Sequence, residues 1–245
     1  MKYGTRAWLE LQYAASGDDP WGLDWRPSQR LRYASMLAAV RQVAGTAWTP
    51  RRIVDAGCAT GAFTAMLAKI APEAEVIGID IAESAVARAR ARYAGIAFER
   101  MALDECASKF AVSADLVSCL EVLYYLPREE RAEALKQLRT MLRPGGILLV
   151  SSMIAGHPYI SQEELVALVA TELSVVHTGT LYLKPVVLWE KAQMRMRRLW
   201  HGSRSPLSLC STLADTDRVA RLAVWSKRIL GARAQSHGFV VARLG

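Results

Sequence analysis

The stretch that decides the fold reads Ile53-Val54-Asp55-Ala56-Gly57-Cys58-Ala59-Thr60-Gly61-Ala62-Phe63. An apolar strand ends in an acid, turns through two glycines and runs directly into a helical pattern over 62–70. At such a junction the first backbone N–H groups of the helix are free to receive an anion. Glycine also lets the backbone come closer to a ligand than a residue with a Cβ would allow. The stretch therefore predicts the ligand-binding edge of an α/β sheet.

Strand and helix patterns alternate on either side of this turn. The predicted strands are 52–55, 75–80, 96–101, 115–120, 147–152, 173–182 and 238–244, and the predicted helices are 28–44, 62–70, 83–93, 128–142, 161–171, 185–200 and 215–230. This alternation predicts an α/β protein with a doubly wound, Rossmann-like sheet. Ser161, followed three residues later by Glu164, has the pattern of a capping box at the start of its helix.

The chain of 245 residues can bury one sizeable core with an appended subdomain. We expect an N-terminal lid and helix over 1–48 and a cofactor-binding α/β domain over 49–183. A helical insertion over 184–233 then precedes the last strand, which lies within 234–245.

The four cysteines are scattered and form no C-x-x-C pair, which argues against a disulfide framework and a structural zinc. No carboxylate and histidine cluster has the pattern of a metal site, so we expect no metal. No stretch has the length and apolar purity of a membrane span, and the start does not read as a signal peptide. These features predict a cytoplasmic protein.

The net charge of +8 is unevenly distributed along the chain. Residues 184–245 hold twelve Lys and Arg against three Asp and Glu, whereas residues 1–183 are almost neutral. The basic insertion is open to four interpretations: a packed subdomain with a solvated face, a cap over the acceptor, a membrane-surface contact, or a nucleic-acid footprint. No RNA-binding module accompanies the charge and the aromatic residues form no stacking platform, so we do not expect a nucleic-acid partner.

A second acid, Asp80, ends the strand 75–80 that is expected to lie beside the first. A carboxylate at that position can accept hydrogen bonds from both hydroxyls of a ribose. The turn after the first strand lacks the G-x-G-x-x-G of a dinucleotide site and the Gly-Lys-Ser/Thr of a P-loop. A purely structural turn with two glycines remains the alternative.

Four motifs follow one another in the chain: Asp55-x-Gly57-Cys58-x-Thr60-Gly61, Asp80, the run 115–123 (DLVSCLEVL), and 142–146 (LRPGG). Their order and spacing resemble those of class I S-adenosylmethionine-dependent methyltransferases over about residues 50–152. Ala59 stands where that family often has another glycine. Shorter motifs near the start (18–21, DDPW), around Arg32 and over 121–126 (EVLYYL) are similar to those of the NodS-type N-methyltransferases. These enzymes act on the free amine of a chito-oligosaccharide.

The resemblance implies that S-adenosylmethionine is the cofactor. The residues expected to hold it are Trp21, Arg32, Asp55, Ala56, Gly57, Cys58, Gly61, Asp80, Ile81, Leu103, Asp104 and Glu121. In this scheme Asp55 orients the amino group through water, and Asp80 and Ile81 hold the ribose and one adenine face. Leu103 and Asp104 close the adenine pocket. Trp21 and Arg32 form part of a lid, although the tryptophans 21 and 25 could equally staple the first helix to the sheet.

For catalysis the candidates are Glu121, Tyr124 and His157. An amine acceptor needs only to arrive unprotonated, whereas a hydroxyl acceptor needs a base. Tyr124 and Tyr125 replace the His-His pair that many small-molecule methyltransferases carry there, which favours N-methylation. His177 lies within a predicted strand and is interpreted as structural.

The sequence thus predicts a methyltransferase for a small-molecule or carbohydrate acceptor, with N-methylation favoured. Three alternatives stay open: an O-methyltransferase of a sugar or natural product, a nucleic-acid methyltransferase that uses the basic segment, and a cofactor-binding protein without catalysis. The acceptor, the role of 184–233 and the oligomeric state are undetermined by the sequence.

Overall fold

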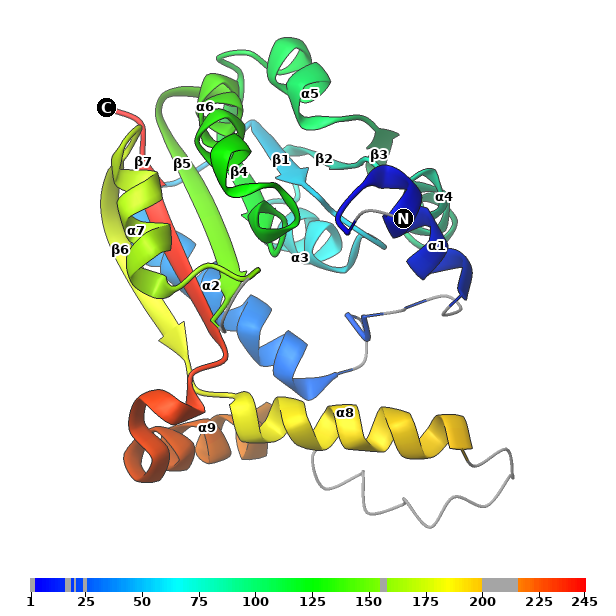
Figure 1. Cartoon of the computed structure of the whole chain (residues 1–245). Helices are drawn as coiled ribbons and strands as arrows, with labels where there is room; N and C mark the ends of the chain where they lie inside the picture. The colour runs from blue at the N-terminus through cyan, green and yellow to red at the C-terminus, as the bar shows by residue number, and fades with distance from the viewer. Residues whose placement is uncertain (1–2, 16–18, 20, 24–25, 155–157, 200–215) are drawn as a thin grey trace.

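The computed structural model describes residues 3–15, 19, 21–23, 26–154, 158–199 and 216–245. In this part of the chain one seven-stranded sheet has the order β3-β2-β1-β4-β5-β7-β6 (Figure 1). The strands are β1 Arg52–Ala56, β2 Glu75–Asp80, β3 Ala97–Arg100, β4 Ala114–Leu120, β5 Leu142–Met153, β6 Ser174–Leu181 and β7 His237–Arg243. The predicted Rossmann-like α/β fold is confirmed.

Four neighbour pairs, from β3 through to β5, are parallel, and β7 runs antiparallel to both β5 and β6. All the parallel strands therefore end at the same edge of the sheet. The order reverses at β1, with β2 on one side and β4 on the other. Ligands of open α/β sheets bind outside the carboxyl ends of strands at such a switch point.

Helices cover both faces of this sheet. In the described part of the chain the helices are α1 Arg6–Ala15, α2 Pro27–Ala44, α3 Ala62–Ile70, α4 Glu83–Arg92, α5 Leu103–Lys109, α6 Arg131–Met141, α7 Gln162–Ala170, α8 Lys184–Leu199 and α9 Thr216–Leu230, of which α8 and α9 lie beyond one edge of the sheet. Buried residues of α2 and α3 pack on one face in a cluster that includes Met36, Leu67 and Leu149. Residues of α6 and α7 pack on the other face, where Leu138 and Leu165 meet Val117.

Two described helices, α1 and α5, were missing from the sequence prediction. The seven-residue helix α5 is too short to give a clear helical period. Tertiary contacts hold α1. Its Glu10 carboxylate accepts hydrogen bonds from the Glu83 N–H at 2.6 Å and from the Ser84 hydroxyl, which caps the N-terminus of α4. Arg88 of α4 donates in return to the Tyr13 carbonyl at 3.0 Å.

The strand predicted from Ile147 begins earlier, at Leu142. The turn residues 143–146 stay in the sheet as an irregularity, since the register with β4 shifts between Ala114 and Leu116. Gly145 N–H donates to the Leu244 carbonyl at 2.9 Å, which ties the turn to the end of β7. The predicted helix 128–142 likewise divides into a 3₁₀ turn, Arg128–Glu130, followed by α6. The predicted capping box at Ser161 and Glu164 is confirmed.

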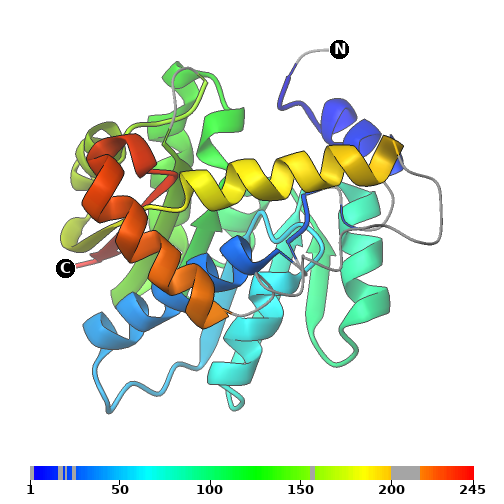
Figure 2. The same ribbon diagram turned by 90° about the horizontal axis from the view of Figure 1, so that it is seen from below.

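Helices α8 and α9 extend beyond the carboxyl edge of the sheet (Figure 2). They pack on α2 through a small apolar cluster of Leu183, Val186, Val187 and Val219 with Leu31. In Figure 1, α8 lies below the edge at which the parallel strands end, and in Figure 2, seen from below, it crosses in front of that edge. Among the described residues, no helix combines the length and the hydropathy that a membrane crossing requires.

Candidate functional site

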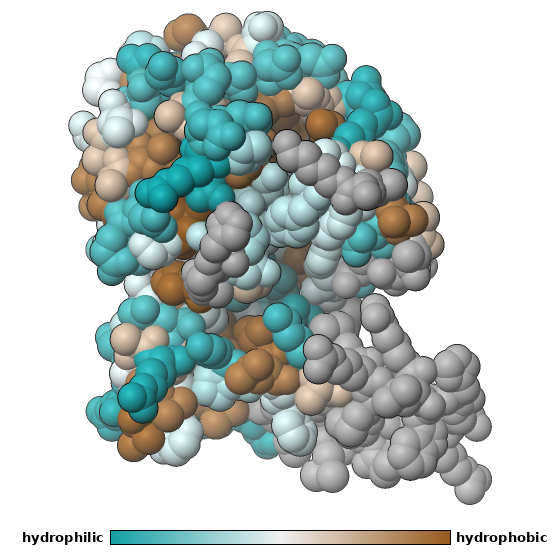
Figure 3. Space-filling model, in the orientation of Figure 1, coloured by the Kyte–Doolittle hydropathy of each residue, from teal (hydrophilic) through white to brown (hydrophobic). Residues whose placement is uncertain are grey.

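A cavity of about 800 Å³ opens at the carboxyl edge of the sheet. The surface is hollowed there, between the main body and the lower part that carries α8 and α9 (Figure 3). The walls come from the ends of β1, β2 and β4, from α1 and α2, and from α8 and the start of β7. Segments from the whole length of the chain therefore meet around one enclosed space of the size that small-molecule sites have.

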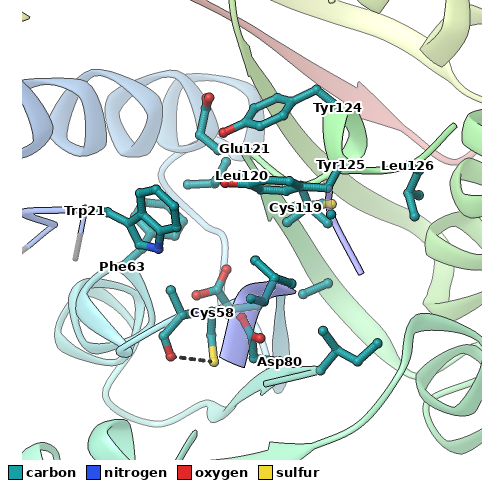
Figure 4. Close-up of a pocket in the computed structure, with 18 of the residues that line it drawn as sticks. Trp21, Cys58, Phe63, Asp80, Cys119, Leu120, Glu121, Tyr124, Tyr125 and Leu126 are labelled. Atoms are coloured by element: carbon teal, nitrogen blue, oxygen red, sulfur yellow. Dashed lines mark hydrogen bonds between the residues drawn. The ribbon is translucent and has the colours of Figure 1, made fainter. Parts of the chain in front are cut away.

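The turn after β1 and the end of β2 form one wall of the cavity. The backbone N–H groups of Gly57 and Cys58 both donate to the Ile79 carbonyl at 2.8 Å. The Asp80 carboxylate accepts from Ala59 N–H and Ala82 N–H, each at 2.9 Å. Because two carboxylate oxygens offer about four acceptor sites, Asp80 keeps capacity for further donors on its cavity side. Figure 4 places Asp80 and Glu121 on opposite sides of the drawn site.

The glycines of this turn are required by packing. A Cβ on Gly57 would lie 2.2 Å from Val122 Cγ2, and the residue has a φ of 80°. A Cβ on Gly61 would meet the Phe98 ring at 2.7 Å, and Gly61 is not among the described residues that line the cavity. Ala59 adopts a φ of 51°, a left-handed conformation that favours glycine.

Gly57→Ala should lower the free energy of unfolding by about 2–4 kcal/mol, because it adds both a left-handed alanine and an overlap with Val122. Gly95→Ala is the matched control: Gly95 has a φ of 88° in the turn that Ile96 N–H closes onto the Tyr93 carbonyl, but a Cβ added there would meet no atom within 4 Å, so only the backbone cost of about 1–2 kcal/mol applies. Urea unfolding of both variants measures the difference. Equal losses would show that the Val122 contact does not explain Gly57.

Asp55 lies beneath the turn and is 2% exposed. Its carboxylate accepts hydrogen bonds from the Thr64 hydroxyl at 2.6 Å and the Ser118 hydroxyl at 2.7 Å. Burial raises the pKa of Asp55 to about 6, although these two hydrogen bonds act in the opposite direction. Asp55 also lines the cavity, so a ligand can reach its vicinity.

The raised pKa of Asp55 predicts how the stability of the ligand-free protein changes with pH. An acid whose pKa rises on folding contributes most stability below its unfolded value, and that contribution is lost as the pH rises through the folded value. The stability of Asp55→Asn relative to the wild type should therefore grow between about pH 4 and pH 7, by a total of about 3 kcal/mol. Urea unfolding of both proteins across this range gives the difference. Parallel pH profiles would show that Asp55 is not strained by its burial.

Glu121 follows β4 and has a φ of 61°, an uncommon conformation for a residue other than glycine. Its Oε1 lies 3.3 Å from Arg32 Nη1 and accepts from the Ser151 hydroxyl at 2.9 Å. Its Oε2 is buried and has no hydrogen-bond partner, as is also true of Arg32 Nε. Burial raises the pKa of Glu121, while Arg32 and Ser151 offset part of this shift. A strained residue with a free buried acceptor is an expected feature of a ligand site.

Aromatic side chains enclose the space beside Glu121. The Trp8 ring lies 5.9 Å from Tyr125, 4.8 Å from Tyr3 and 6.4 Å from Trp21. Tyr124 packs against Tyr125, with ring centroids 4.6 Å apart (Figure 4). Of these residues Trp21, Tyr124 and Tyr125 were singled out from the sequence, whereas Tyr3 and Trp8 were not. The spacing of Trp8, Leu9 and Tyr13 was the available signal for a helix with a buried face before residue 28.

A buried ion pair anchors α8 across the cavity. Glu190 is 3% exposed, and its Oε2 lies 2.7 Å from Arg26 Nη2. The same carboxylate accepts from the N–H of Ser28 at 3.0 Å. Val187 and Lys191, on the same helix, therefore line the cavity together with His237 of β7. The sequence analysis had included Lys191 only as part of the basic insertion over 184–233, without assigning it to the site.

The structure brings together nearly all of the predicted site residues that it describes. The cavity is lined by Trp21, Arg32, Asp55, Ala56, Gly57, Cys58, Asp80, Ile81, Leu103, Asp104, Glu121 and Tyr124. Gly61 is the exception, for the packing reason given above. His157 lies outside the described residues. His177 of β6 stacks on Phe239 of β7, with ring centroids 6.0 Å apart, and does not line the cavity. No group of three or more His, Cys, Asp or Glu in the described ranges could hold a metal ion.

Comparison with known proteins identifies the domain. Residues 53–146 match the family model of a methyltransferase domain. Over these residues the chain is a methyltransferase domain, and its sheet has the class I methyltransferase fold. Its predicted family is thus confirmed, and the family's cofactor is S-adenosylmethionine.

Two kinds of curated relative are similar to the chain. Trans-aconitate 2-methyltransferase of Methylobacterium nodulans is 35% identical over 135 residues, or 52% of this chain and 49% of that protein. Nodulation protein S of Bradyrhizobium diazoefficiens is 34% identical over 148 residues, or 59% of this chain and 66% of that protein. The matched part of the chain thus spans about half the length of the first of these relatives.

The solved structure of the N-methyltransferase NodS from Bradyrhizobium japonicum, in complex with S-adenosylhomocysteine, shares the fold. It aligns with a TM-score of 0.61 at 21% identity and covers 98% of this chain and 99% of that chain. The fold similarity to NodS therefore extends beyond the residues that match the methyltransferase domain model.

The described residues of the cavity fit this cofactor. Asp80 retains acceptor sites for ribose hydroxyls, and the apolar side chains of Ile81 and Leu103 line the same wall. Arg32 Nε, a buried donor without a partner, suits a carboxylate.

Proposed function

We propose that this protein is an S-adenosylmethionine-dependent methyltransferase that methylates an amine of a small-molecule or carbohydrate acceptor. Bound in the cavity, the cofactor supplies a methyl group already activated on a sulfonium. Asp80 would accept from the ribose hydroxyls, and Arg32 would pair with the methionine carboxylate. Asp55 would orient the cofactor's amino group through water. Ile81, Leu103 and Asp104 would surround the adenine.

The observation that best supports an amine as the methyl acceptor is the free oxygen of Glu121 beside the aromatic side chains. The unpartnered, buried Oε2 can accept an N–H of the acceptor and take up its proton. The rings of Trp8 and Tyr125 would favour a cationic alkylammonium, both on arrival and as the methylated product. Enclosure by α1, α2 and α8 would hold the acceptor in line and exclude water.

One other acceptor has specific support. The relatives named trans-aconitate 2-methyltransferase make a carboxylate a second candidate, since the Methylobacterium nodulans protein is 35% identical to this chain and the nodulation relative is 34% identical. Methylation of a carboxylate would give an ester, and methylation of a sugar hydroxyl would give an ether. The product chemistry therefore separates the three outcomes.

A panel of acceptors with methyl-labelled S-adenosylmethionine tests the proposal. The panel contains deacetylated chitobiose, glycine, phosphoethanolamine and trans-aconitate, and the products are treated with mild alkali and analysed by mass spectrometry. We expect label on nitrogen in at least one amine, stable to alkali. Label released as methanol would identify an ester, and alkali-stable label on oxygen would identify an ether; either result alone would refute N-methylation. Cofactor binding without any labelled product would favour a non-catalytic protein.

A further inference from the structure

We propose that the acceptor of this enzyme carries an anionic group, and that Lys191 and His237 bind this group on the α8 side of the cavity. The inference rests on the proposed function, whose acceptor it defines more closely as a small amine that also bears a carboxylate or a phosphate.

Lys191 and His237 reach the cavity from different parts of the fold. Lys191 lies one turn beyond Val187 on α8, and His237 begins β7, paired with Met153 of β5 and Leu181 of β6. The contacts of Glu190 with Arg26 and Ser28 fix the helix that carries Lys191. The two side chains therefore share a wall whose position is set by buried contacts, and not by a free surface helix.

His237 is a buried polar group that lacks a partner. It is 6% exposed, and its Nδ1 makes no hydrogen bond. A buried ring nitrogen without a partner costs free energy, so its presence in a cavity wall points to a ligand that completes it. An anionic oxygen can accept from His237 when the proton is on Nδ1.

The charges around His237 favour the binding of an anion over the binding of a neutral hydrogen-bond donor. Burial holds the pKa of His237 well below its ordinary value, and Arg32, Arg26 and Lys191 lower it further. Glu190 compensates the charge of Arg26, and Glu121 that of Arg32. Lys191 has no carboxylate within 4.0 Å among the described residues, so its charge is available to a ligand.

This subsite is separate from the groups assigned to the cofactor. Arg32 is reserved for the methionine carboxylate, and Asp80 lies at the end of β2, on the other side of β1 from β4, β5 and β7. Glu121 follows β4, between these two regions of the sheet edge. An acceptor whose amine reaches Glu121 can thus extend its anionic end toward β7 and α8. Recognition at both ends would fix the amine for transfer.

Calorimetric binding to the protein loaded with S-adenosylhomocysteine tests the inference without turnover. The probes are two pairs of amines, phosphoethanolamine with ethanolamine and β-alanine with β-alaninamide, which differ in the anionic group. We expect at least one anionic member to bind 10-fold or more tightly than its neutral partner. Lys191→Gln and His237→Gln should each reduce this preference about 10-fold, and Lys184→Gln, on the same helix but outside the cavity, should leave it unchanged.

Each result separates the inference from its alternatives. The phosphate pair and the carboxylate pair show which anion the site accepts. A preference that survives both substitutions, or the lack of any preference, would overturn the inference. Weaker binding of S-adenosylhomocysteine by the Lys191 variant would also overturn it, because the subsite would then belong to the cofactor.

If binding follows the prediction but the labelled methyl is found on oxygen, the subsite stands and the amine assignment fails. Lys191 is exposed, so its variant remains informative if His237→Gln does not fold.

Discussion

Asp80→Ala should weaken S-adenosylmethionine binding about 10- to 150-fold, the range expected for lost hydrogen bonds to a charged group. The carboxylate is 9% exposed, lines the cavity and keeps acceptor sites beyond those used by Ala59 and Ala82. Calorimetric titration of the folded variant measures the change.

Asp115→Ala is the matched control for Asp80→Ala. Asp115 is also buried, and it accepts from two backbone groups, Arg51 N–H at 2.8 Å and Arg52 N–H at 2.9 Å. It sits at the opposite, amino end of β4, away from the cavity. Its loss should lower thermal stability and leave cofactor affinity within about twofold. Equal loss of affinity in both variants would mean that Asp80 acts through the fold alone.

Glu121→Gln should lower kcat/KM for an amine acceptor about 100-fold near pH 7, within the range for a lost general base. Gln keeps the shape and can still accept from Ser151, but it cannot take up the ammonium proton. The deficit should shrink as the pH approaches about 10, where an alkylamine arrives unprotonated. The pH profile of kcat/KM for both proteins gives the comparison.

Glu133→Gln, at the cavity wall on α6, is the control for Glu121→Gln and should leave kcat/KM nearly unchanged. A Glu121→Gln deficit that stays constant up to pH 10 would mean that Glu121 positions the acceptor without taking up its proton. Full activity of the variant at pH 7 would remove Glu121 from the catalytic account.

The cavity wall formed by the turn after β1 and the end of β2 could be predicted from the sequence, because the signals for it are local. One strand, a turn with two glycines and the following helix specify the region of Asp55 and Gly57, and the next strand ends at Asp80. Parallel pairing then brings the two acids to the same edge. The reason for glycine at 57 was different from the one expected, since the space of its missing Cβ is filled by Val122, which is remote in the sequence.

The wall that α8 and the start of β7 form was not predictable, because its signals are not local. His237 and Lys191 reach the cavity through pairings with β5 and β6 and through the contacts of Glu190, whose partners Arg26 and Ser28 are more than 160 residues away. The basic composition of the C-terminal quarter gave no local signal that set Lys191 apart from the other basic residues near it in the sequence. Nothing in the sequence indicated the left-handed backbone of Glu121, which directly follows β4 and donates its N–H to the carbonyl of Ser151, 30 residues further along the chain.

A crystal structure with S-adenosylhomocysteine and an amine acceptor tests the central claim most directly. We expect the ribose hydroxyls within hydrogen-bond distance of the Asp80 carboxylate. The acceptor nitrogen should lie between the cofactor sulfur and the free oxygen of Glu121. A ribose bound away from Asp80, or an acceptor oxygen in place of the nitrogen at the sulfur, would contradict it.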